Sequence, residues 1–200
     1  MRQETEIKLR VTSPLATKRK LAKLGFAPAG PRLFERNLLF DFPDCRLRKS
    51  RTALRLRFEN GRNLMTYKGA PVDAPGYKVR REIETEVKDG LRMKQTLEAL
   101  GLREVFRYEK YRTKYKQPSH GRRRGSKGRA PGELDFDQTP IGDFIELEGP
   151  KRWIDFVARQ LGYGREDYIT QSYASLYLAR CAQRGEKPRN MVFAGSQSGR

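Results

Sequence analysis

Charged and apolar residues alternate strictly at the start of the chain. Glu4, Glu6 and Lys8 fall in one phase, whereas Ile7 and Leu9 fall in the other. A period of two residues is typical of a β-strand whose two faces meet different surroundings. We therefore predict a strand over residues 1–11.

The same alternation returns along most of the chain and predicts further strands. Asn60–Gly61 and Thr139–Gly142 are turn signals that join neighbouring strands into hairpins. The further predicted strands are residues 33–42, 52–59, 62–69, 77–87, 104–116, 133–138 and 143–149, and the predicted helices are residues 13–26, 91–100, 152–163 and 169–181. Closely spaced antiparallel strands with a few helices predict a mainly β (α+β) domain, either a barrel or a sandwich.

The charge of the chain adds to this picture. Charged residues make up 34% of the sequence, and 43 Lys and Arg against 24 Asp and Glu give a net charge of +19. Such an excess favours anionic partners, namely phosphate esters, nucleic acid or an acidic surface.

Several protein classes are disfavoured by the remaining composition. Cys45 and Cys181 lack metal-ligand spacing and suit a reducing compartment, so we expect a cytoplasmic protein. The single histidine, His120, argues against a histidine-based zinc site or a Ser-His-Asp triad. We expect no membrane association, because no apolar run approaches the ~18 residues of a membrane helix.

The signs of the alternating charges are sorted by strand. Taken singly, each charged face is best explained as a surface in contact with water. The whole set favours another interpretation, a closed sheet whose charged faces point inward and form a tunnel with a cationic wall and a carboxylate wall. Like charges crowded in such a tunnel need a ligand, and a polyphosphate with Mg²⁺ or Mn²⁺ suits both walls. The acidic strand positions are Glu4, Glu6, Glu82, Glu84, Glu86, Asp135, Asp137, Glu146 and Glu148, and the basic ones are Arg55, Arg57, Lys68, Lys110, Arg112 and Lys114.

An ordered series of motifs resembles the CYTH superfamily, the triphosphate tunnel metalloenzymes. The series is ETEIK from Glu4, LRLR with Arg55 and Arg57, TYKG with Lys68, REIETEV with Glu82 and Glu84, YEKYR with Lys110 and Arg112, LDFDQTPIGDFIELEG, and ITQSYASLY. The resemblance spans residues 2–177 and implies a closed eight-stranded antiparallel β-barrel with helices packed outside. It would form a single domain over residues 1–180, interrupted by a basic insertion at residues 118–132. Residues 181–200 are expected to form a polar, disordered tail.

The resemblance also implies roles for residues of this sequence. Triphosphate substrates of the superfamily include ATP, thiamine triphosphate and inorganic triphosphate, and the metal would be Mg²⁺ or Mn²⁺. Metal ligands or their supports would be Glu4, Glu6, Asp137, Glu146 and Glu148; phosphate-binding residues would be Lys8, Arg55, Arg57, Lys68, Lys110 and Arg112; catalytic residues would be Glu6, Lys8 and Glu148; and Glu82 and Glu84 would line the tunnel.

Some alternatives stay open at this point. The shared motifs do not separate a class IV adenylate cyclase from a triphosphatase. Tyrosines and bases interleave in RYEKYRTKYK, which is also typical of a nucleic-acid-binding module without catalysis. The acidic pairs Glu4/Glu6 and Glu146/Glu148 argue against a nucleic-acid-binding module, because carboxylates have no use on a surface that binds a phosphate backbone. The sequence does not decide the oligomeric state, a homodimer included, or whether Arg80 or Arg81 points inward.

Overall fold

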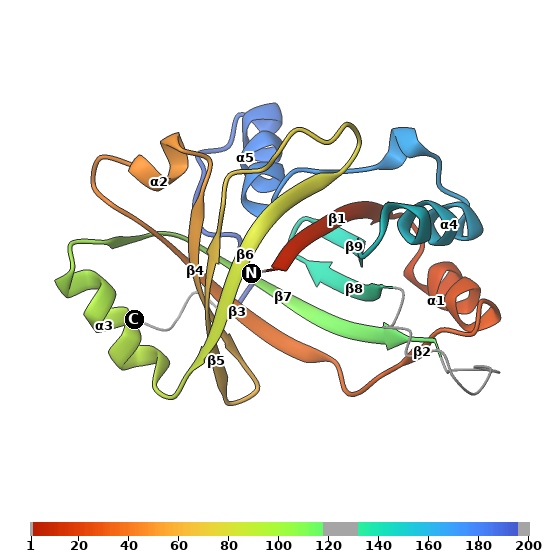
Figure 1. Ribbon diagram of the computed structural model, residues 1–200, viewed down its shortest axis with the longest axis horizontal. Helices are drawn as coiled ribbons and strands as arrows, with labels where there is room; N and C mark the ends of the chain where they lie inside the picture. Colours follow the sequence, from red (N-terminus) through yellow and green to blue (C-terminus); the bar gives the residue numbers. More distant parts are fainter. Residues whose placement is uncertain (1, 118–131, 196–200) are drawn as a thin grey trace.

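The computed structural model describes residues 2–117 and 132–195 (Figure 1). The predicted basic insertion therefore lies outside the described residues, apart from Gly132, as do the last residues of the predicted tail. No helix within the described ranges is both long and apolar enough to span a membrane.

Nine strands and five α-helices make up the described part of the chain. The strands are β1 (Arg2–Val11), β2 (Ala27–Pro28), β3 (Leu33–Asp41), β4 (Ala53–Glu59), β5 (Arg62–Lys68), β6 (Lys78–Val87), β7 (Arg103–Lys116), β8 (Glu133–Thr139) and β9 (Gly142–Glu148). The helices are α1 (Pro14–Lys23), α2 (Arg46–Lys49), α3 (Gly90–Ala99), α4 (Lys151–Leu161) and α5 (Tyr173–Arg184), with a 3₁₀ turn, η1 (Arg165–Asp167).

Eight of the strands close into an antiparallel barrel. Their order is β7-β3-β4-β5-β6-β1-β9-β8, and β8 pairs back with β7 to complete the ring, while the short β2 adds to β7 from outside. Closure removes the two exposed edges that an open sheet would have. The fold predicted from the charge pattern is confirmed.

Strand β1 shows why the alternation produces a closed barrel. Its apolar residues Ile7 and Leu9 are fully buried on the outer face, yet Glu6 and Lys8 on the inner face are also buried. Both faces of one strand can be buried only if another layer covers the outside and the lumen encloses the inside.

The outer layer consists of helices that pack apolar stripes onto the strands. Leu21 of α1 and Ile154 of α4 join Leu9 and Phe136 in one core cluster, and Leu97 of α3 joins a second cluster with Leu56. Burying each such side chain contributes about 1.5–3 kcal/mol. The helices thus hold the barrel from outside and leave its lumen to the charged residues (Figure 1).

The turn between β4 and β5 has the backbone that its sequence predicts. Asn60 and Gly61 both have positive φ angles, 46° and 81°. Two successive residues in this region form the hairpin turn whose twist matches the flanking strands. The observed register, in which Arg55 stands opposite Thr66, follows from this turn.

The C-terminal segment differs from the predicted disordered tail. Helix α5 continues to Arg184, and Met191 is fully buried where it bridges to Tyr108 of β7. The Glu109 N–H donates to the Met191 carbonyl, and the ring of Phe193 lies 5.2 Å from that of Tyr111. The prediction was wrong for residues 181–195, because three consecutive apolar residues in a polar stretch gave too short a signal.

Candidate active site

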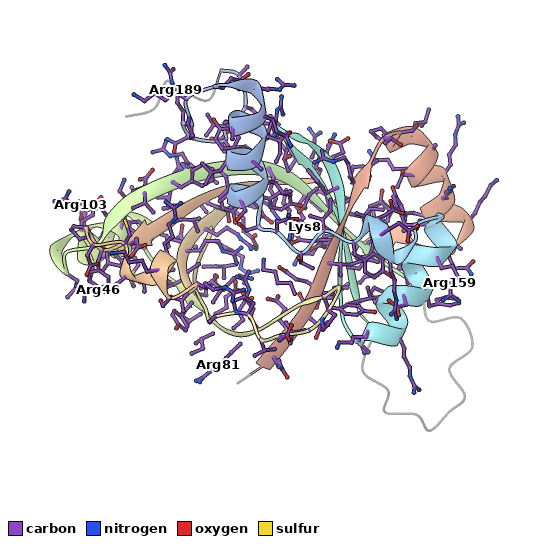
Figure 2. The ribbon with its side chains drawn as sticks, turned by 90° about the horizontal axis from the view of Figure 1, so that it is seen from above. Lys8, Arg46, Arg81, Arg103, Arg159 and Arg189 are labelled. Atoms are coloured by element: carbon purple, nitrogen blue, oxygen red, sulfur yellow. The ribbon has the colours of Figure 1, made fainter. Side chains whose placement is uncertain are left out.

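The lumen of the barrel contains a cavity of about 1210 Å³. Seen from above, Lys8 lies in the middle of the ring of strands, whereas Arg81, Arg103 and Arg159 lie at its periphery (Figure 2). Every residue that the sequence placed at the site lines this cavity except Asp137. These residues are Glu4, Glu6, Lys8, Arg55, Arg57, Lys68, Glu82, Glu84, Lys110, Arg112, Glu146 and Glu148.

Strand register sets the neighbours of each inward side chain. On β1 and β9, Glu6 stands opposite Glu148 and Lys8 opposite Glu146. Directly opposite residues have Cβ atoms about 4.5–5.5 Å apart, so Lys8 faces an opposite charge in Glu146, whereas Glu6 and Glu148 bring two carboxylates together.

Glu6 is the centre of the first ion-pair group. Its Oε1 lies 2.8 Å from Lys78 Nζ, 3.7 Å from Lys8 Nζ and 3.8 Å from Arg80 Nη2. Burial would raise the pKa of Glu6, but the charges of Lys8 and Lys78 outweigh it and hold the pKa well below its ordinary value. Glu6 is therefore ionised at neutral pH.

The two lysines beside Glu6 respond differently to the same burial. Burial lowers the pKa of Lys78 to about 8, even though Glu6 favours its charged form. For Lys8, burial also favours the neutral form, but the charges of Glu146 and Glu6 prevail and raise its pKa. Lys8 is thus a fixed cation, whereas Lys78 titrates closer to neutral pH.

Glu4 and Glu82 form a coupled carboxyl pair around Lys68. Lys68 Nζ lies 3.2 Å from Glu4 Oε2 and 2.5 Å from Glu82 Oε2, so the two carboxyl groups meet at one ammonium group. Burial and the bond to Glu4 raise the pKa of Glu82 to about 7. Burial acts the same way on Glu4, but its bond to Glu82 and the charge of Lys68 lower its pKa to about 2. The pair therefore shares one proton below neutral pH.

Two arginines of β4 supply the opposite, cationic wall. Arg55 Nη2 donates to Thr66 Oγ1 at 3.1 Å and to Glu84 Oε2 at 3.3 Å. Arg57 Nη1 donates to Glu59 Oε2 at 3.2 Å. Burial would lower the pKa of Arg55, but surrounding groups, Tyr108 first among them, raise it well above its ordinary value. Both guanidinium groups face the lumen.

Asp137 lies behind the cationic wall rather than on the lumen, where the sequence had placed it. Its side chain is fully buried and accepts bonds from Lys110 Nζ at 2.9 Å, Arg112 Nε at 2.7 Å and the Tyr173 hydroxyl at 2.7 Å. Its strand phase was predicted correctly, but these three longer side chains cover it. A buried carboxylate with three donors fixes the positions of the two cations in front of it.

Glu35 is a second buried anion, and the sequence analysis did not identify it. It is fully buried on β3, with its oxygens 3.4 Å from Lys110 Nζ, 3.5 Å from Arg57 Nε and 3.6 Å from Arg112 Nε. Burial would raise its pKa, but these cations hold the pKa well below its usual range. Its signal was weak, because the residues nearest to it in the same phase of β3, Leu33, Asn37 and Leu39, are uncharged.

Other contributors were also missed or left undecided. The inward residue of the undecided pair is Arg80, which lines the cavity, while Arg81 is exposed. Asp135, which the sequence placed on the acidic face without a role, lies 2.7 Å from Arg112 Nη1, and burial raises its pKa to about 6. Lys78 shares its phase with Arg80, so their side chains enter the lumen together.

Tyr173 enters the site from a helix, where strand periodicity gives no signal. It is the first residue of α5, and the preceding Ser172 caps that helix by accepting the Ser175 N–H. The Tyr173 ring centre lies 5.1 Å from Lys8 Nζ and 5.3 Å from Lys110 Nζ. Burial and the nearby carboxylates raise its pKa well above the ordinary value, so the hydroxyl remains a donor.

The donor atoms of the carboxylate wall are of the type that hard divalent cations prefer. No group of three or more carboxylate, histidine or cysteine side chains within residues 2–117 and 132–195 is arranged around a metal position by itself. However, Glu4 and Glu82 both contact Lys68, and Glu6 stands opposite Glu148 on the neighbouring strand, which brings oxygen ligands together. The residues therefore fit Mg²⁺ or Mn²⁺ if phosphate or water oxygens complete the coordination.

Part of the cavity lining is apolar. Leu39, Phe106 and Leu178 are among the residues that line it. Leu39 and Phe106 pack on the cluster that contains Tyr173, whose ring also contacts Lys8 and Lys110. The cavity can accommodate an organic group beside a phosphate chain.

Comparison with known proteins identifies the relatives of this arrangement. The family model described as CYTH domain matches residues 2–173. A Methanocaldococcus jannaschii protein named "Putative adenylate cyclase MJ0240" is 35% identical over 145 residues, which cover 72% of this chain and 75% of that protein.

Two solved structures share the fold. Pyrococcus horikoshii protein PH1819 matches with a TM-score of 0.71 and 25% identity, covering 88% of this chain and 99% of its own. The Hippeastrum protein HpAC1, described as revealing a dominant triphosphatase activity, matches with a TM-score of 0.59 and 20% identity, covering 92% and 97%.

Proposed function

Because the chain belongs to the CYTH domain family, we propose that it is a divalent-metal-dependent enzyme that binds a triphosphate in its lumen and cleaves one of its phosphorus–oxygen bonds. The observation that carries this proposal is the convergence of cations from five strands, interleaved with carboxylates, in one enclosed cavity. A polyanion accompanied by a metal cation complements both sets of charges.

The phosphate chain would be held by the cationic wall. Arg55 and Arg57 present guanidinium groups that match phosphate oxygens in pairs, and Arg112 does the same from β7. On binding, phosphate oxygens would replace part of the carboxylate contacts that these cations now make. Lys8, Lys68 and Lys110 would add point charges, and we include Lys78 and Arg80 in the proposed set because they line the same cavity.

The carboxylate wall would hold the metal. Glu4, Glu6, Glu146 and Glu148 are the proposed ligands or their supports, whereas the buried position of Asp137 makes it a support for Lys110 and Arg112. When bound, the metal would neutralise negative charge that develops on the phosphate oxygens.

Two reactions are compatible with this site. In hydrolysis, water attacks the terminal phosphorus, the bond to the bridging oxygen breaks, and orthophosphate is released. In cyclisation, the ribose 3′-oxygen of ATP attacks the α-phosphorus and pyrophosphate leaves. Glu6 and Glu148 would accept the proton of the nucleophile or orient it, and Lys8, held as a cation, would assist the 3′-oxygen.

The relatives support both reactions to different degrees. The Methanocaldococcus protein, at 35% identity, carries the name of an adenylate cyclase, which supports testing cyclisation first. The likeness to the Hippeastrum protein shows the fold alone. Its described triphosphatase activity is a reason to include hydrolysis in the same experiment.

The test is a product analysis with three substrates. Purified protein is incubated with Mg²⁺ or Mn²⁺ and ATP, thiamine triphosphate or inorganic triphosphate, and the products are separated by chromatography. A Glu4→Gln/Glu6→Gln variant should lose turnover. A Glu86→Gln/Glu98→Gln variant, which makes the same change at exposed residues, should retain it.

The products decide between the reactions. Cyclic AMP with pyrophosphate from ATP identifies a cyclase, whereas orthophosphate without cyclic AMP identifies a triphosphatase. If none of the three substrates is turned over with either metal, the proposal is wrong and a binding function takes its place.

A further inference from the structure

The positive charge of this protein is concentrated outside its lumen. Cations and carboxylates in the cavity are interleaved and nearly balanced, so the net charge of +19 belongs to the rest of the chain. A triphosphate inside the barrel therefore gives no account of most of the basic residues.

One part of the outer surface combines these cations with an exposed aromatic ring. We define the α1–α4 face as Arg19 and Lys23 of α1 with Arg152, Phe156 and Arg159 of α4, all exposed. The two helices lie side by side (Figures 1 and 2), joined where Lys20 Nζ donates to the Leu161 carbonyl at 3.0 Å. Within the described residues, none of the four cations on this face forms an ion pair.

The outer side of α4 has a regular arrangement. Arg152, Phe156 and Arg159 are spaced i, i+4 and i+7, so they form one stripe along the helix. Phe156 has 58% of its surface exposed, while Ile154 on the opposite side is fully buried against the barrel. Packing in the core therefore does not explain why a phenyl ring lies exposed between two unpaired arginines.

Acidic groups do not offset this face. Helix α1 contains no acidic residue. The one acid of α4, Asp155, is engaged elsewhere, because it accepts bonds from Arg165, Tyr77 and Tyr168 and forms no ion pair with Arg152 or Arg159 within the described residues. The face therefore presents uncompensated positive charge with an aromatic platform at its centre.

From this geometry we propose that the α1–α4 face binds single-stranded nucleic acid without sequence preference. The arginines and lysine would contact backbone phosphates, and Phe156 would stack on a base, the combination that non-specific single-strand binding uses. A duplex would leave the ring without a stacking partner. A membrane is disfavoured because Ile154, Val157 and Leu161, the apolar side of α4, are buried in the core.

The proposal concerns a second site and does not rest on the lumen. Its test uses fluorescence anisotropy with a labelled oligothymidylate of about 20 nucleotides, longer than one typical binding site. Titrations are repeated at several salt concentrations, with EDTA and inorganic triphosphate present so that the lumen does not bind the oligonucleotide.

Three variants separate charge, stacking and background. Arg152→Ala/Arg159→Ala should lower the magnitude of the salt slope by about 1.4, since each single-strand phosphate contact contributes about 0.7. Phe156→Ala should weaken binding about tenfold at an unchanged slope. Arg81→Ala/Arg103→Ala removes the same charge from exposed positions away from α4 and should keep both slope and affinity (Figure 2).

Several results would overturn this assignment. Equal losses in the two double variants would mean that overall charge alone attracts the oligonucleotide. An unchanged affinity of Phe156→Ala, or equal binding of inorganic polyphosphate, would exclude stacking. Tighter binding to anionic lipid vesicles would make the face a membrane site. Because Glu4→Gln/Glu6→Gln should leave oligonucleotide binding intact, failure of either proposal is distinguishable from failure of the other.

Discussion

The bond between Tyr173 and Asp137 makes a quantitative prediction about how α5 is held to the barrel. The Tyr173 hydroxyl donates to Asp137 Oδ2 at 2.7 Å, and neither residue is exposed to solvent beyond 5%. A Tyr173→Phe substitution removes this one hydroxyl. It keeps the ring and its contacts with Lys8 and Lys110.

The size of the effect follows from the charge of the acceptor. A hydrogen bond to a charged group contributes about 1.5–3 kcal/mol to stability. Asp137 keeps its bonds from Lys110 and Arg112 in the variant, so the lower end applies, and the free energy of unfolding should fall by about 1.5 kcal/mol. For a domain of this size, that corresponds to a melting temperature lower by about 3–6 °C.

Urea denaturation with EDTA present measures this difference, and Tyr177→Phe is the matched control. Tyr177 lies on the same helix, but its hydroxyl accepts a bond from the Arg189 N–H, an exposed neutral group, at 3.2 Å. Removing this hydroxyl should lower the free energy of unfolding by about 0.5 kcal/mol, and the slope of that free energy against urea concentration should not change. Equal stabilities of the two variants would refute the assignment of Asp137 as a buried carboxylate that needs this donor.

Three further predictions follow from other parts of the structure. The pKa of Glu82, about 7, lies above its ordinary value, so its contribution to stability is complete below pH 4.5 and is lost as the pH rises through 7. Urea denaturation without metal at a series of pH values should show the free energy of unfolding falling as the pH rises through 7, and Glu82→Gln should abolish this fall. The same dependence on pH in the variant would contradict the proton shared by Glu4 and Glu82. Arg112→Lys cannot keep the paired contact with Asp137, so KM for the triphosphate should rise about tenfold in steady-state kinetics, and an unchanged KM would exclude Arg112 from phosphate binding. Met191→Ala should lower the free energy of unfolding by about 2 kcal/mol because the side chain is fully buried, and no change in calorimetry would mean that residues 185–195 do not hold to β7.

Much of the barrel could be predicted because charge and strand period coincide. Most inner strand faces carry charges at alternate positions, as in Arg55 and Arg57 of β4. A solvated sheet has the same pattern on one strand, and only the repetition across strands favoured closure. This is why fold and cavity-lining residues were predicted together.

The elements that were missed have backbones or partners that a local pattern does not specify. Helix α2 begins after Cys45 and is followed by Arg51, and both have positive φ angles, 58° and 59°, without being glycine. Such strain is imposed by tertiary contacts, here by Asp41, whose carboxylate accepts the N–H groups of Leu47 and Arg48. No pattern in residues 42–52 signals it.

The sequence also could not predict which inward side chains reach the cavity and which are covered by others. Asp137 and Glu146 share the inner phase, but only Glu146 lines the cavity. The difference arises because Lys110, Arg112 and Tyr173 meet over Asp137, and Tyr173 arrives from a helix that follows at a distance in the chain. Strand phase gives the face of a side chain, whereas its exposure depends on which longer side chains cover it.

The central claim is that the lumen binds a triphosphate through its cationic wall, and one calorimetric titration tests it most directly. A triphosphate with non-hydrolysable bridges is titrated with Mg²⁺ into the unmodified protein, Arg55→Ala/Arg57→Ala and Arg81→Ala/Arg103→Ala. We predict saturable one-to-one binding that weakens more than about tenfold in the first variant, as expected for lost charge-assisted bonds, and is retained in the second. Equal weakening in both variants, or no saturable binding to the unmodified protein, would contradict the claim.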